Sequence, residues 1–254
     1  MILNSRIEGQ GFPFIILHGY MGMSDNWKTL AGKYAALGFQ VHALDLRNHG
    51  KSFHSNNFNY EVMVQDVLDY CDHYGITKAH FLGHSMGGKL VMYLAALKPN
   101  LIEKLIIADI APKYYSPHHQ TILAALNAVD FNTKPSRSEV DEIMSKYIKD
   151  AGTKQFLLKN LYWVEPGQLG FRFNLEVFNK DPEVIGQAIP KNTFFEGETL
   201  FLRGDKSDYI LEEDFEDIHK HFPKAVVKTI TNAGHWVHAE NPEMFSNLVI
   251  DFLT

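Results

Sequence analysis

The stretch Gly83-His84-Ser85-Met86-Gly87 lies between an apolar run, residues 79–82, and a segment of helical periodicity with apolar residues at positions 90, 91, 94, 95 and 97. A strand therefore leads into a helix through a turn with Ser85 at its apex. This is the context of a nucleophile elbow, because glycines two positions before and after the serine let the strand and the helix approach closely. The other interpretation is a glycine-rich turn whose serine only caps the helix.

Strands and helices alternate on either side of this turn. Strands are expected at residues 2–7, 12–17, 40–44, 103–109, 199–202 and 225–230, and helices at residues 26–37, 60–74, 212–221 and 242–253. The alternation predicts an α/β fold with a mostly parallel central sheet and helices on both faces. Loops at the carboxyl ends of such strands form the ligand crevice.

Residues 113–196 interrupt the alternation. They show helical patterns at 117–129, 136–149 and 153–161, with a short one after Asp181-Pro182. An insertion of this length at the carboxyl edge of the sheet is expected to cover the crevice as a helical cap. The predicted division is a core domain of residues 1–112 and 197–254 and a cap of residues 113–196.

Composition narrows the classes of function. The 254 residues carry a net charge of -6 and no basic block, which argues against nucleic acid or an anionic membrane as a partner. No apolar run approaches the roughly 18 residues of a membrane span, and no secretory signal pattern is present. The single cysteine, Cys71, allows no intramolecular disulfide. We therefore expect a cytoplasmic protein, without membrane insertion, that acts on a small molecule. The oligomeric state is left open.

Three residues at strand ends have the properties of a catalytic triad. Asp109 ends the strand 103–109 at the same edge of the sheet as Ser85, and His235 lies in a loop past the last strand. A serine nucleophile needs a histidine as general base and a carboxylate that orients it, and the chain order Ser, Asp, His is typical of serine enzymes on such a sheet. His238 is the alternative base, and Asp109 has the alternative role of bracing its turn.

Two backbone amides are candidates for an oxyanion hole. The loop His18-Gly19-Tyr20-Met21-Gly22, after the strand 12–17, can leave N–H groups pointing into the space above the strand ends. The amide of Tyr20 and that of Met86, just after the serine, are the expected donors.

Charged residues near the crevice also have expected partners. Asp45 and Arg47 are predicted to fix the loop 45–52 by a salt bridge. Lys89, in the first turn of a helix, opposes the helix dipole and is expected to pair with a carboxylate or to reach solvent.

Five stretches together resemble the α/β-hydrolase superfamily and, within it, the small YbfF-type esterases. They are His18-Gly19, Asp45-Leu46-Arg47-Asn48-His49-Gly50, Gly83-His84-Ser85-Met86-Gly87-Gly88-Lys89, Asp109-Ile110-Ala111-Pro112 and Gly234-His235-Trp236-Val237-His238-Ala239. The resemblance runs nearly end to end. It implies a serine hydrolase that acts on carboxylic esters without a cofactor, with acyl-CoA thioesters as further candidate substrates. For thioesters, Arg47, Lys89 and Lys113 are the cations expected to meet the CoA phosphates.

The superfamily and the YbfF-type pattern differ over the triad acid. Most α/β-hydrolases place it three residues beyond the glycine that here is Gly204, and this chain has Ser207 at that position, flanked by Asp205 and Asp208. The YbfF-type pattern implies Asp109 instead. We predict Asp109 as the acid and keep Asp208 as the alternative, because triads are defined by geometry and not by chain position.

Other reactions remain open on the same fold. A carbon-carbon bond hydrolase or a cofactor-free haloperoxidase would keep the triad and differ only in the pocket. A hydrolase-fold receptor would bind a small apolar ligand under the cap with little turnover. A haloalkane dehalogenase is disfavoured, because it needs an aspartate where Ser85 stands.

Overall fold

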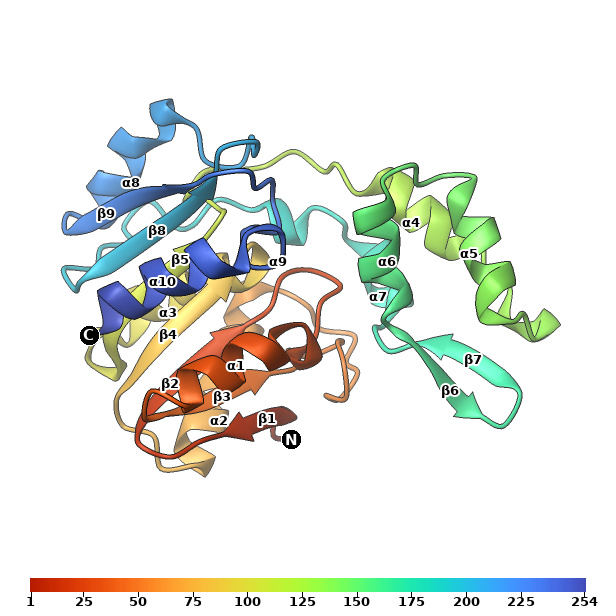
Figure 1. Cartoon of the computed structure of the whole chain (residues 1–254), viewed down its shortest axis with the longest axis horizontal. Coiled ribbons are helices and arrows are strands. Elements are labelled where there is room, and N and C mark those ends of the chain that lie inside the picture. The colour runs from red at the N-terminus through yellow and green to blue at the C-terminus, as the bar shows by residue number, and fades with distance from the viewer.

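The computed structural model describes residues 1–254 and contains a seven-stranded sheet in the order β1-β3-β2-β4-β5-β8-β9 (Figure 1). The strand β1 is antiparallel to β3, and all other neighbouring pairs are parallel. The prediction of a mostly parallel α/β sheet is therefore confirmed. The strands are β1 (Ser5–Glu8), β2 (Phe12–Leu17), β3 (Phe39–Leu44), β4 (Ala79–His84), β5 (Ile102–Ala108), β8 (Thr199–Gly204) and β9 (Ala225–Ile230).

Helices bury both faces of this sheet (Figure 1). On one face lie α1 (Lys28–Ala35) and α10 (Pro242–Leu253), and on the other lie α2 (Tyr60–His73), α3 (Met86–Leu97) and α8 (Phe215–His221). All six residues of β4 are buried, as expected of a central parallel strand. Its neighbouring residues Phe81 and Leu82 point into the two different cores.

Several helix starts differ from the expected ones by a few residues. A 3-10 turn, Ser24–Trp27, precedes α1, and a second one, Glu212–Asp214, precedes α8. A short helix, α9 (Val237–Glu240), follows the loop after β9. None of the helices combines the length and the apolar character that crossing a bilayer requires.

The insertion between β5 and β8 is only partly helical. Its helices are α4 (Gln120–Asn127), α5 (Arg137–Ser145), α6 (Ala151–Leu158) and α7 (Leu175–Lys180), followed by the 3-10 turn Val184–Gly186. It also holds an antiparallel hairpin of β6 (Leu161–Glu165) and β7 (Gln168–Phe171). The helical patterns predicted neither the hairpin nor α7. The Pro-Gly pair of the connecting turn, with Gly167 at φ 81°, is the signal that could have indicated the hairpin.

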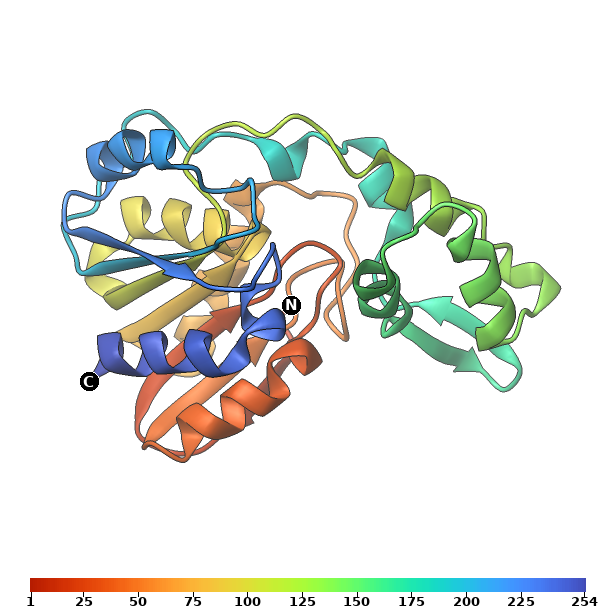
Figure 2. The same ribbon diagram turned by 45° about the horizontal axis from the view of Figure 1, so that its top comes forward.

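Two long connections join this insertion to the sheet and run close to each other (Figure 2). We call residues 110–119 the outgoing strap and residues 181–198 the returning strap. The N–H of Tyr115 donates to the carbonyl of Gly186 at 2.8 Å, and the N–H of Ile189 donates to the carbonyl of Pro112 at 3.0 Å. The straps are therefore paired with each other. The division of the chain at residues 113 and 196 stays a prediction.

The turn between β4 and α3 has no room for side chains at its two glycines. A Cβ atom on Gly83 would lie 2.2 Å from the carbonyl oxygen of Gly87, and one on Gly87 would lie 2.4 Å from the carbonyl oxygen of Leu17. Both obstacles are backbone atoms of packed strand or helix. The close approach of β2, β4 and α3 therefore depends on these glycines.

We expect the substitution Gly87→Ala to destabilise the protein by at least about 2 kcal/mol, because a methyl group must displace the backbone of β2. Urea unfolding measures this change. Gly32→Ala in α1 is the matched control: its Cβ meets only the flexible side chain of Glu8, at 3.3 Å. A helical Gly→Ala change of that kind stabilises by roughly 0.5–1 kcal/mol. Equal effects of the two substitutions would contradict the steric account.

Candidate active site

Ser85 stands at the junction of β4 and α3 in a backbone conformation that few non-glycine residues adopt. Its φ is 52° and its ψ is -117°, and its N–H donates to the carbonyl of Ala108 at 3.0 Å. A residue held in such a region costs of order 1–3 kcal/mol and persists only where its surroundings enforce it. Here the elbow lifts the hydroxyl above the end of the sheet.

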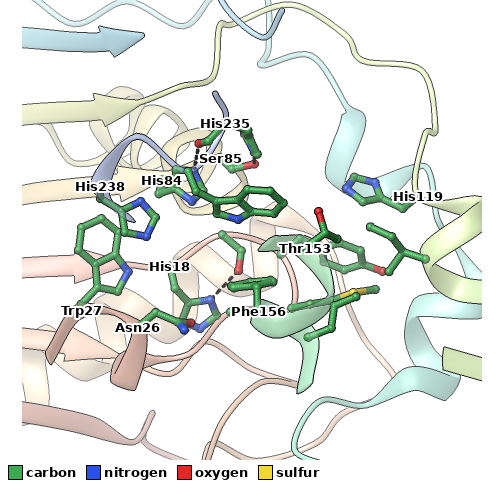
Figure 3. Close-up of a pocket in the computed structure, with 17 residues that line it drawn as sticks. His18, Asn26, Trp27, His84, Ser85, His119, Thr153, Phe156, His235 and His238 are labelled. Atoms are coloured by element: carbon green, nitrogen blue, oxygen red, sulfur yellow. Dashed lines mark hydrogen bonds between the residues drawn. The ribbon is translucent and has the colours of Figure 1, made fainter. Parts of the chain in front are cut away.

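His235 and Asp109 form a continuous hydrogen-bonded chain with this hydroxyl. The Nε2 atom of His235 lies 2.9 Å from Ser85 Oγ, and its Nδ1 atom lies 2.8 Å from Asp109 Oδ2 (Ser85 and His235 are labelled in Figure 3). The three residues come from the ends of β4, of β5 and of β9. The structure thus brings together the three residues that the sequence suggested, in the geometry that a serine nucleophile, a base and an orienting acid require.

Burial sets the protonation of this chain. Removal from water lowers the pKa of His235, so its imidazole is neutral at physiological pH, as a general base must be. Removal from water raises the pKa of Asp109, and two hydrogen bonds oppose this by stabilising the carboxylate. The donors are the N–H of Gly204, at 3.0 Å, and the hydroxyl of Ser207. The ring of Tyr209 stacks on His235, with centroids 3.7 Å apart.

Neither of the two expected oxyanion donors bonds to an acceptor within the protein. The N–H of Met86 is the first of α3 and has no acceptor within the helix, as for every first turn. The N–H of Tyr20 donates to no acceptor in the protein. Both residues line cavities that reach Ser85. Their role as an oxyanion hole remains a proposal.

Ser85 lies where two cavities meet. The larger has about 540 Å³ of empty space and the smaller about 360 Å³, and both figures include the open mouths of the cavities. Ser85, Tyr20 and His119 line both. Figure 3 shows the larger cavity, where His119, Thr153 and Phe156 of the insertion face residues of the sheet edge. Apart from the shared residues, the larger cavity is lined by His235, Trp236, Ile122 and Phe156 among others, and the smaller by Met86, Ile110, Tyr115, Ile185 and Tyr209 among others.

Comparison with known proteins agrees with this arrangement. The family described as alpha/beta hydrolase fold matches residues 13–132. An esterase, YbfF, of Escherichia coli strain K12 is 38% identical over 234 residues, which cover 91% of this chain and 89% of that protein. The chain belongs to the α/β-hydrolase superfamily. Within it, the chain groups with the YbfF-type esterases.

Two further relatives of this hydrolase are similar over most of their length. An sn-1-specific diacylglycerol lipase of Mus musculus is 36% identical over 246 residues, covering 94% of this chain and 80% of that protein. A solved structure described as a marine microorganism esterase superimposes with a TM-score of 0.96 at 37% identity and covers 99% of both chains.

The hydrolase keeps its buried carboxylate directly after β5, and a serine of the loop after β8 donates to it. Ser207, three residues past Gly204, donates its hydroxyl to Asp109 Oδ2. Asp208 is exposed and makes no side-chain hydrogen bond, and Asp205 accepts from the N–H groups of Asn232 and Ala233. The position where most relatives of the superfamily hold an acid is therefore filled by a donor to Asp109.

Neutral histidines organise the loops of the hydrolase site, a role that the sequence did not indicate. His18 Nε2 accepts from the N–H of Leu46 at 3.0 Å, and His49 Nε2 accepts from the N–H of Met21 at 3.1 Å. Burial lowers the pKa of both, which keeps these acceptor nitrogens unprotonated. His84 Nε2 lies 2.8 Å from the carbonyl oxygen of His235 and anchors that loop.

His238, the alternative base, takes no part in the chain to Ser85. Its ring stacks on Trp27, with centroids 4.2 Å apart and planes inclined by 12°. It lines the larger cavity, but its side chain makes no hydrogen bond.

The expected salt bridge between Asp45 and Arg47 is wrong. Arg47 binds Asp66 instead, with Nη2–Oδ1 at 2.7 Å, and Asp45 accepts from the backbone N–H groups of Ser24 and Lys51. Both residues still fix the loop 45–52, by bonds to α2 and to backbone. The long side chain of Arg47 reaches past Asp45 to Asp66 on α2. The spacing of residues within the loop does not indicate such a partner.

The cations expected near CoA phosphates already have protein partners. Arg47 binds Asp66, and Lys113 Nζ lies 2.7 Å from Asp214 Oδ2. Lys89 is fully buried and its ammonium contacts backbone carbonyls, so it neither pairs with a carboxylate nor reaches solvent as expected. Each of the three is therefore engaged by protein groups, and their contact with CoA phosphates stays a prediction.

We expect Asp109→Asn to lower kcat by about 10⁴-fold, because the amide no longer holds the imidazole in the required tautomer. Initial rates with a p-nitrophenyl ester measure this. Asp208→Asn is the matched control and should keep kcat near the native value, since that carboxylate is exposed and unbonded. A large loss in the control with little loss in Asp109→Asn would transfer the role of acid to Asp208.

Proposed function

We propose that this hydrolase cleaves carboxylic esters through an acyl-enzyme on Ser85. The observation that carries the proposal is the hydrogen-bonded chain from Ser85 Oγ through His235 to Asp109. The esterases and the lipase among its relatives support the same chemistry.

In the first half of the reaction, His235 Nε2 takes the proton of Ser85 Oγ while this oxygen attacks the acyl carbon. Asp109 orients the imidazole and stabilises the imidazolium that forms. The amides of Tyr20 and Met86 donate to the oxyanion, and each donor of this kind is typically worth about 2.7–4 kcal/mol. The N-terminus of α3 adds the positive end of its dipole.

Collapse of the tetrahedral intermediate breaks the bond to the leaving group. His235 returns the proton to the leaving oxygen, which departs as an alcohol. Water then enters, gives a proton to the same nitrogen and attacks the acyl carbon. The carboxylic acid leaves and Ser85 regains its proton.

The two cavities divide the substrate between them. The leaving oxygen must lie within reach of His235 Nε2, and His235 lines only the larger cavity. The alcohol part therefore occupies the cavity of about 540 Å³. The acyl chain extends the other way, past Met86, into the cavity of about 360 Å³ between Ile110 and Ile185.

Thioesters and location are finer parts of the proposal. Acyl-CoA thioesters react through the same acyl-enzyme, although Arg47, Lys89 and Lys113 are engaged elsewhere. A panel of esters and thioesters with one acyl group ranks the two leaving groups. A cytoplasmic location is supported by the single cysteine, Cys71, which is buried and unpaired.

A fluorophosphonate probe should label the native protein at one site and fail to label Ser85→Ala. The probe reacts only with a serine that a base activates, so it separates an esterase from a receptor of the same fold. Intact-mass measurement counts the adducts. Unlabelled native protein, together with retention of a small apolar ligand, would favour the receptor.

Two substitutions, one in each cavity, test which cavity binds the acyl chain and which binds the alcohol. Ile185→Trp narrows the smaller cavity, and we expect it to lower kcat/KM for p-nitrophenyl hexanoate about tenfold relative to the acetate. Ile122→Trp narrows the larger cavity and should instead penalise bulky alcohols on an acetyl ester. Each variant serves as the control for the other. Exchanged effects would reverse the assignment of the two cavities.

A further inference from the structure

Lys89 is a charged side chain that the reaction does not use. It lies one turn after Ser85 in α3, its N–H donates to the carbonyl of Ser85 at 3.0 Å, and its side chain is fully buried. Taking an ammonium out of water is costly unless its donors find acceptors. Burial and the nearby Lys113 lower the pKa of Lys89 to about 7. Its three acceptors oppose that shift, because they match the three N–H groups of the charged form.

Those acceptors belong to the two straps. Lys89 Nζ lies 2.5 Å from the carbonyl oxygen of Lys113 and 3.5 Å from that of Pro112, both on the outgoing strap. It lies 2.5 Å from the carbonyl oxygen of Gln187 on the returning strap. One ammonium therefore joins both connections of the cap at a single point. It also lies 5.1 Å from the ring centroid of Tyr115.

Two tyrosines extend this attachment along the returning strap. The hydroxyl of Tyr60 on α2 donates to the carbonyl of Ile185 at 2.9 Å, and that of Tyr93 on α3 donates to the carbonyl of Ala188 at 3.2 Å. Their rings stack with centroids 4.9 Å apart. Together with Lys89, they hold three carbonyls within the segment 185–188. The straps are thus bonded to the same helix that carries the nucleophile at its start.

The straps form one side of the smaller cavity. Tyr115, Ser116 and Pro117 of the outgoing strap line it, as do Ile185 and Gly186 of the returning strap. Residues of the core, including Ser85 and Met86, line the same cavity. The bonds from Lys89 to the straps therefore determine how far the strap residues of the smaller cavity lie from Ser85.

We propose that Lys89 is a positioning residue for substrate selection: its ammonium clamps the two straps to α3 and so fixes the wall of the acyl cavity relative to Ser85. It acts through the straps and touches neither the reacting atoms nor the substrate. The proposal rests on the assignment of the smaller cavity to the acyl chain.

The test compares Lys89→Met with the native protein. Methionine keeps an apolar stem of similar length and removes all three donors. With p-nitrophenyl hexanoate and acetate, which share a leaving group, we expect the hexanoate-to-acetate ratio of kcat/KM to fall about tenfold, mainly through KM. Hydrogen exchange should accelerate at amides of residues 110–116 and 184–189. A folded Lys89→Met with the native ratio and native exchange in both straps would overturn the proposal.

Tyr93→Phe gives the same test without disturbing a buried charge. It removes one donor to the returning strap, and we expect a smaller fall in the ratio, with faster exchange near Ala188. Tyr34→Phe is the matched control, because that buried hydroxyl bonds to neither strap and lies in the core on the other face of the sheet. If Lys89→Met does not fold, a Tyr93→Phe variant indistinguishable from Tyr34→Phe overturns the proposal.

The two proposals fail separately. Fluorophosphonate labelling of native protein and of Lys89→Met reports the serine chemistry alone. If the native protein neither reacts nor turns over esters, the function is wrong, while exchange in the straps still decides whether Lys89 clamps them. If Lys89→Met is labelled normally and keeps both the native hexanoate-to-acetate ratio of kcat/KM and native hydrogen exchange in the straps, only the role of Lys89 is wrong.

Discussion

The carboxylate of Asp109 is the buried charge on which the site depends. An anion removed from water must collect hydrogen bonds, and those of Asp109 come from Gly204, Ser207 and His235. These donors lie at the end of β8 and in the loops after β8 and β9, so satisfying one charge fixes both loops. The hydrogen bond from His235 Nδ1 to this carboxylate therefore fixes the imidazole ring. In that position Nε2 of the ring faces Ser85.

Elements with a strong local pattern were predicted to the residue. The strands Phe12–Leu17 and Ala225–Ile230 and the helix Pro242–Leu253 match their expected bounds, because turn residues and proline delimit clear apolar periods. The hairpin Leu161–Glu165 and Gln168–Phe171 was missed, since its first strand is mostly exposed and lacks an alternating apolar face. The Pro-Gly turn was a weaker signal than the helical periods around it.

The chemistry of the site was easier to infer than its supporting contacts. Ser85, Asp109 and His235 each follow a strand, so topology alone brings them to one edge of the sheet. The partners of Arg47 and Lys89 lie on elements that are distant along the chain, and no spacing rule reports them. A neutral histidine such as His49 is also invisible to patterns, because its role arises from a backbone amide that tertiary packing delivers.

Reaction and selection are separated in this fold. Every group assigned to the reaction, from Tyr20 to His235, lies in a loop at the edge of the sheet or at the start of α3, where strand ends and the elbow fix the geometry. Both cavities, in contrast, are lined in part by residues of the insertion and its straps. A change in the insertion can therefore alter which ester fits while the hydrogen bonds of the chain from Ser85 to Asp109 stay intact. In return, the shape of the cavities depends on how the two straps are held. Charge-assisted hydrogen bonds are directional, so the Lys89 ammonium, which donates to both straps, fixes them more precisely than a hydrophobic contact would.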